Sequence, residues 1–224
     1  SIAKNKITSS PFYNKKTNLK NLNNLNNIKA KILGYSKPEE TLKKFKNDNT
    51  VTGRIAKVTS LHKLGKNKKS INIIKTLIED EPFNPYFYET LGKIYLDNGQ
   101  VGESIIAFER ARQISNNNPL ILLGYSQALI SADNSKSYLD AIILLEKAIK
   151  KLEKNYTAFR LLEIAYGRSK IYGKSMLAGA EKSLISGNKN EANYKATQAL
   201  KLLKVNSPDF FRAKDIIFIT KKNK

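Results

Sequence analysis

The residue types that carry out enzymatic chemistry are sparse in this chain. His62 is the single histidine and cysteine is absent, so the chain holds no HExxH zinc motif, Ser-His-Asp triad or thiolate metal site of its own. Asp80 and Glu81 are adjacent near an expected helix end, where neighbouring side chains do not face each other. We therefore predict no catalytic residue and no metal ligand, and interpret His62 as structural.

Two further patterns with catalytic potential are better explained as helix ends. Glu39 and Glu40 fall in the first turn of an expected helix, where carboxylates are favourable. Tyr172–Ser175 contains Gly-Lys-Ser, but it lacks the leading glycine and the preceding strand of a phosphate-binding loop. The elements that must position all these residues are therefore helices and their turns.

The composition constrains partners and location. A net charge of +21, from 40 Lys plus Arg against 19 Asp plus Glu, raises nucleic acid or an anionic surface as a partner. Only six of these cations are arginine, the residue whose planar guanidinium forms paired hydrogen bonds with bases and phosphates. A solvated lysine surface is therefore favoured over a nucleic-acid-binding surface. The sequence has neither the long apolar run of a membrane span nor a signal-peptide core. Because it begins at Ser1, we expect a piece of a longer protein.

A register of 34 residues organises the chain from Val51 onward. The pairs Gly65 and Gly99, Ser70 and Ser104, and Pro85 and Pro119 are each separated by 34 residues, the length of a tetratricopeptide (TPR) repeat. The segment 84–119 has the apolar and small residues of such a repeat: Tyr88, Leu91, Gly92, Tyr95, Gly99, Ser104, Phe108 and Ala111. A helix pair of this kind needs stacked neighbours to bury its core.

The sequence predicts an all-α fold, a TPR-like α-solenoid of antiparallel helix pairs that follows an irregular helical lead-in. The lead-in covers 1–50 and holds two short helices. Leu19, Leu22, Leu25, Ile28, Ile32 and Leu33 form the apolar stripe of the first, which must be held by packing because asparagine lowers its helix propensity. The solenoid covers 51–224, with repeats near 51–84, 85–118, 119–155 and 156–203 and a capping helix at 208–219. The turn of the third repeat has three extra residues, which do not argue against the repeat because the entropy of loop closure changes little with loop length.

The first helices of TPR repeats line a concave groove. The register predicts a mixed groove with an apolar middle, suited to a helix or an extended segment of a protein partner. Its residues are Ile55, Tyr86, Glu89, Lys93, Leu96, Leu120, Leu123, Gln127, Ile130, Arg160 and Ile164. Alternatively, some of these positions pack against another domain of the same polypeptide.

The chain also resembles the C-terminal half of BepA-like bacterial periplasmic zinc metallopeptidases. The matching segments are SPFYNKK (10–16), IKAKILGY (28–35), PEETLKKF (38–45), EDEPFNPYFYETLGKIYLDNGQVGESI (79–105), RLLEIAYGR (160–168) and SPDFFRAKDI (207–216). The resemblance implies a periplasmic location, zinc in an upstream HExxH domain, and contacts with that domain in cis and with outer-membrane assembly proteins. No zinc ligand carries over, since HExxH is missing here, and the chain itself needs no cofactor.

Three functional hypotheses follow. The leading one is a non-catalytic protein-binding TPR module, the C-terminal part of a metallopeptidase that acts in outer-membrane protein assembly and quality control. The alternative is a free-standing TPR adaptor or scaffold. The least favoured is a basic protein that binds nucleic acid or an anionic surface.

Overall fold

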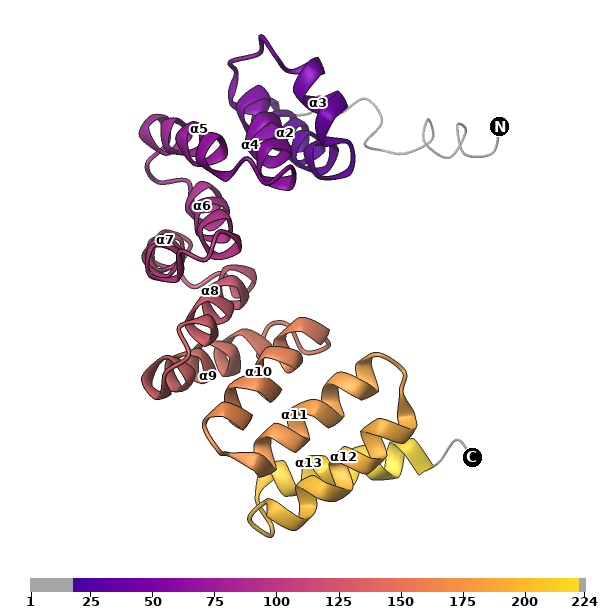
Figure 1. Cartoon of the computed structure of the whole chain (residues 1–224). Coiled ribbons are helices and arrows are strands. Elements are labelled where there is room, and N and C mark those ends of the chain that lie inside the picture. The colour runs from indigo at the N-terminus through magenta and orange to yellow at the C-terminus, as the bar shows by residue number, and fades with distance from the viewer. Residues whose placement is uncertain (1–17, 222–224) are drawn as a thin grey trace, which may run out of the picture. The chain divides into compact units, whose positions relative to one another are not determined.

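The computed structural model describes residues 18–221, and its regular elements in that range are all α-helices (Figure 1). The all-α class predicted from the sequence is thus confirmed. The segment SPFYNKK (10–16), which belongs to the predicted lead-in, lies outside the described residues. The chain divides into two compact units, Ser1–Glu79 and Asp80–Lys224.

The described part of the first unit comprises four helices: α2 (Leu19–Ser36), α3 (Pro38–Lys44), α4 (Val51–Lys63) and α5 (Asn67–Asp80). Helix α2 packs along α4 through small residues, because Ala30 is 1% exposed and a methyl group at Gly34 would lie 2.9 Å from Cβ of Thr59. The predicted apolar stripe of α2 is instead exposed except at Leu33, which is half-buried; Leu19, for example, has an exposed fraction of 75%. The expectation that this stripe would be packed is not met among the described residues.

The second unit comprises eight helices joined by short turns. They are α6 (Pro85–Asp97), α7 (Val101–Ile114), α8 (Pro119–Ser131), α9 (Ser135–Ile149), α10 (Tyr156–Arg168), α11 (Tyr172–Ile185), α12 (Lys189–Leu202) and α13 (Pro208–Lys221). Each helix packs against the next, and α8 also contacts both α6 and α10 (Figure 1). The segment predicted as the fourth repeat, 156–203, holds α10 to α12, and α12 packs on both α11 and α13.

Asparagines open the first helix of each pair in the second unit. The side-chain oxygens of Asn84, Asn118, Asn155 and Asn188 each accept a backbone N–H of the first turn of α6, α8, α10 and α12. Pro85 and Pro119 follow two of these caps, where the missing N–H costs nothing. At the other end of α6, Gly99 adopts a φ of 76°, as the turn into α7 requires.

A recurrent serine bond joins the two helices of a pair. Ser104 Oγ on α7 donates to the carbonyl of Gly92 on α6 at 2.8 Å, and Ser175 Oγ on α11 donates to the carbonyl of Glu163 on α10 at 2.8 Å. In the first unit Ser70 on α5 donates to the carbonyl of Val58 on α4, also at 2.8 Å. Each bond spans 12 residues, which gives the 34-residue spacing of Ser70 and Ser104 a structural cause.

Candidate functional site

The predicted groove residues lie on α4, α6, α8 and α10, the first helices of successive pairs. Ile55 on α4 is half-buried and belongs to the first unit. In the second unit Tyr86 and Leu120 are 55% and 58% exposed, and Lys93 and Gln127 are also exposed. The half-buried members are Glu89, Leu96, Ile130, Arg160 and Ile164.

Leu123 differs from the other predicted groove residues. It is 8% exposed and belongs to the core cluster that also holds Leu122, Leu145 and Leu162. Its side chain stabilises the packing of α8, so the structure does not offer it to a ligand. Ile130 packs against the same cluster but keeps part of its surface exposed.

The remaining nine residues form what we term the first-helix face: Tyr86, Glu89, Lys93, Leu96, Leu120, Gln127, Ile130, Arg160 and Ile164. The contacts of α8 with α6 and α10 bring the three helices of this face side by side. Helix α8 contains no charged residue, and Lys93 is the single lysine of the three helices. In a chain with a net charge of +21, this face is therefore unusually poor in lysine.

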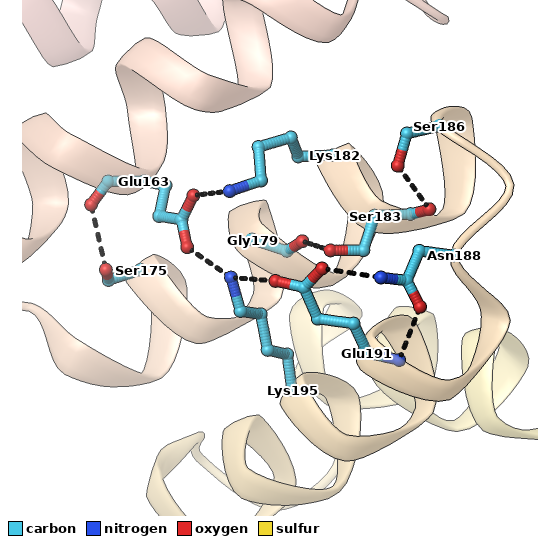
Figure 2. Close-up of polar contacts among 9 residues, drawn as sticks. All are labelled: Glu163, Ser175, Gly179, Lys182, Ser183, Ser186, Asn188, Glu191 and Lys195. Carbon is cyan, nitrogen blue, oxygen red and sulfur yellow. Dashed lines mark hydrogen bonds and ion pairs between the residues drawn. The ribbon is translucent and has the colours of Figure 1, made fainter.

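A cluster of two carboxylates and two lysines lies where α10, α11 and α12 meet (Figure 2). Glu163 on α10 accepts from Lys182 Nζ on α11 and from Lys195 Nζ on α12, each at 2.7 Å. Lys195 also contacts Glu191 at 2.9 Å, and Asn188 donates to Glu191 at 3.1 Å. The charges of the cluster balance, so it joins three helices without leaving a free acid or base.

The electrostatics of the cluster agree with a structural role. Burial alone would raise the pKa of Glu163, but the hydrogen bonds from Lys182 and Lys195 outweigh burial and hold the pKa below its ordinary value. Burial likewise acts to lower the pKa of Lys195, yet its bonds to Glu163 and Glu191 leave the pKa raised. Both partners therefore stay charged near neutral pH, and neither is poised for proton transfer.

A second polar group links α9, α10 and α11. Tyr166 donates its hydroxyl to Oε1 of Glu146 at 2.5 Å, and Lys174 Nζ lies 3.3 Å from the same oxygen. Burial, together with the bond to Glu146, raises the pKa of Tyr166. The phenol therefore remains protonated and acts as a donor between helices.

His62 contacts its own helix pair. Its Nδ1 lies 3.2 Å from Oδ1 of Asn67 on α5, as suits a structural histidine at a turn. Between residues 18 and 221, no group of three or more His, Asp or Glu side chains is arranged to hold a metal ion. In the same range no helix is both long enough and apolar enough to cross a membrane.

Comparison with known protein families agrees with the helical-repeat architecture. Residues 72–178 match a family model described as the TPR domain of cytochrome c-type biogenesis protein H, a span that runs from within α5 to within α11. No curated protein sequence matches the chain. The chain contains a TPR domain, as the 34-residue register predicted.

Solved structures show the same architecture. MamA (residue 41 to the end) from Desulfovibrio magneticus RS-1 has a TM-score of 0.56 at 13% identity, and the match covers 81% of this chain and 94% of that one. A tetratricopeptide repeat protein from Parabacteroides merdae has a TM-score of 0.51 at 13% identity, covering 98% and 88%. At this identity the likeness establishes the fold alone, and the predicted TPR-type α-solenoid is confirmed.

Proposed function

We propose that this chain is a non-catalytic protein-binding module whose first-helix face receives an apolar, weakly charged segment of a partner. TPR solenoids are protein–protein interaction modules, and extended surfaces built from successive repeats are how solenoids bind. The observation that carries the proposal is the near absence of lysine from α6, α8 and α10. A surface meant only to stay solvated would share the lysine content of the rest of the chain.

The chemistry of the first-helix face defines the partner. Tyr86 and Leu120 offer exposed apolar surface, and Leu96, Ile130 and Ile164 extend it with half-buried side chains. Tyrosine is one of the residue types that contribute most of the affinity at protein interfaces, and the surrounding aliphatic side chains keep water away from such an anchor. The few charges of the face, Glu89, Lys93 and Arg160, are of mixed sign and suit a segment with little net charge.

Selection from a random peptide library tests this proposal. We expect the selected peptides to be rich in apolar residues and to bind with an affinity that changes little with salt. Tyr86→Ala and Leu120→Ala should each weaken binding about tenfold, equivalent to 1.4 kcal/mol. Ile143→Ala is the matched control, because Ile143 is 64% exposed on the second helix α9 and its replacement should change nothing. Selection of acidic peptides whose affinity falls steeply with salt would instead support a basic-surface function.

We further propose that the module is the C-terminal part of a periplasmic zinc metallopeptidase that acts in outer-membrane protein assembly and quality control. This rests on the sequence resemblance, above all NPYFYE in 84–89 and AYGR in 165–168. Zinc would belong to the upstream domain, which would contact this chain in cis. The upstream reading frame provides the test: an HExxH motif is expected there, whereas an initiator Met close before Ser1 would favour a free-standing adaptor.

A further inference from the structure

Helix α2 exposes a row of large aliphatic residues along the side that faces away from α4. Its buried side is formed by Ala30 and Gly34, which permit close approach to α4. The opposite side carries what we term the α2 outer stripe, with exposed fractions between 45% and 60%: Leu25, Ile28 and Ile32. Large apolar side chains that are exposed next to one another mark candidate interaction sites on soluble proteins.

The spacing of the α2 outer stripe is that of a coiled-coil seam. At about 100° per residue, Leu25, Ile28 and Ile32 lie within one narrow sector of the helix. Their separations of three and four residues correspond to heptad positions a, d and a. Lys29 and Lys31 then fall at positions e and g, where they flank the seam on both sides.

The charge of α2 decides which occupant fits. The helix contains no Asp or Glu, so a second copy would bring Lys29 and Lys31 against lysines of the same kind. The segment 1–17 of this chain has four lysines and no acidic residue, and it would be repelled in the same way. Charges at e and g set partner choice in coiled coils, so the complementary partner carries carboxylates at these positions.

We propose that the α2 outer stripe is a docking site for an amphipathic helix of a protein partner, with aliphatic residues at positions a and d and Glu or Asp at positions e and g. An anionic membrane surface fits less well. Interfacial helices carry a wide apolar face with Trp or Phe and a polar face rich in Lys or Arg. Helix α2 has a narrow stripe without Trp or Phe, and the rest of its surface is rich in asparagine.

Two synthetic helical peptides of about three heptads test the proposal against the 224-residue chain. Both carry the same Leu and Ile at a and d, while one has Glu and the other Lys at e and g. By fluorescence anisotropy we expect the Glu peptide to bind at least about tenfold more tightly than the Lys peptide. This preference should shrink as salt is added, because exposed charges are screened.

Variants of α2 locate the site. Ile28→Ser should weaken binding of the Glu peptide about tenfold or more, whereas Ile106→Ser, at an equally aliphatic position that is 72% exposed on α7, should not. The double variant Lys29→Glu with Lys31→Glu should invert the preference, so that the Lys peptide binds better. Both α2 changes are on the exposed side, so the helical content measured by circular dichroism should match the parent.

Three outcomes would overturn the proposal. The first is equal affinity for the two peptides, or a preference that survives the double charge reversal. The second is binding only to vesicles that contain phosphatidylserine, which would assign the stripe to a membrane surface. The third is concentration-dependent dimerisation of the parent that Ile28→Ser abolishes, which would assign it to a second copy.

Discussion

Glu163 and Gly179 fit together as a large side chain and the space left for it: a methyl group at Gly179 would lie 2.4 Å from Oε1 of Glu163. The α6–α7 pair has the opposite arrangement, in which the small residue Gly92 is on the first helix. A methyl group at Gly92 would lie 2.8 Å from the ring of Phe108 on α7. The α10–α11 pair thus holds a carboxylate on its first helix where the α6–α7 pair has no side chain.

Gly179→Ala should therefore destabilise the chain, although alanine is the better helix former. The added methyl group meets both Glu163 Oε1 and, at 2.9 Å, Cδ of Lys195, so the ion pair must shift. We expect a loss of about 1 to 3 kcal/mol in the free energy of unfolding, measured by urea denaturation. Gly102→Ala on α7 is the control: nothing lies within 4 Å of the added methyl group, so it should not destabilise the chain. In a Glu163→Ala background the cost of Gly179→Ala should shrink, and an unchanged cost would refute the steric explanation.

The Glu163 cluster should also make stability depend on pH. The pKa of Glu163 in the folded chain lies below its ordinary value of 4.5, so its contribution is present above that value and is lost as the pH falls through the folded pKa. Glu163→Gln should cost about 1 to 3 kcal/mol near neutral pH, because Lys182 and Lys195 lose a charged acceptor. The difference in melting temperature between parent and variant should narrow below pH 4.5. Glu153→Gln, the same change at an exposed turn residue, should have the melting temperature of the parent at every pH. If the difference in melting temperature between the parent and Glu163→Gln stayed the same at every pH, the predicted pH dependence would be wrong.

The fold class could be predicted because it depends on features that sequence displays directly. Turn glycines such as Gly99, the serine that bonds the opposite helix, and proline after an asparagine cap each recur at fixed spacing because the same local geometry recurs. The Glu163 cluster was missed, since its partners come from three helices and are separated by 19 and 32 residues. The sequence did contain one indication of the cluster: Glu163 of α10 occupies the position that Gly92 has in α6.

The candidate binding site was predictable in part. The register assigns residues to a helix face, and Tyr86 and Leu120, which it assigns to the groove, are exposed. The register does not determine how much of a side chain at the edge of that face is buried, because this depends on the neighbouring helices. Leu123 is covered, and the α2 outer stripe is exposed although its pattern predicts packing. Both differences arise from tertiary contacts that periodicity does not specify.

Phe108→Ala should be the most damaging substitution in the α6–α7 pair. Phe108 is 3% exposed, and its ring fills the space left by Gly92 on α6 and Gly124 on α8. Loss of the ring leaves a cavity that two glycines cannot fill, so we expect about 3 to 5 kcal/mol of destabilisation in urea unfolding. Ile106→Ala, two residues earlier on α7 and 72% exposed, should stay within about 0.5 kcal/mol of the parent. Equal effects of the two variants would show that Phe108 is not part of a packed interface.

Ser104→Ala tests whether the recurrent serine bond contributes to the pairing of helices. Ser104 is fully buried, and its Oγ donates at 2.8 Å to the Gly92 carbonyl on the facing helix. The variant leaves that carbonyl without this donor where water cannot replace it, so we expect a loss of about 0.5 to 1.5 kcal/mol in the free energy of unfolding. Ser131→Ala is the matched control, because Ser131 Oγ also donates to a carbonyl, that of Gln127, but within its own helix and in an exposed setting. Replacement of Ser131 should change the free energy of unfolding by no more than about 0.5 kcal/mol. If Ser131→Ala cost as much as Ser104→Ala, the hydrogen bond between helices would stabilise the fold no more than a bond within one helix.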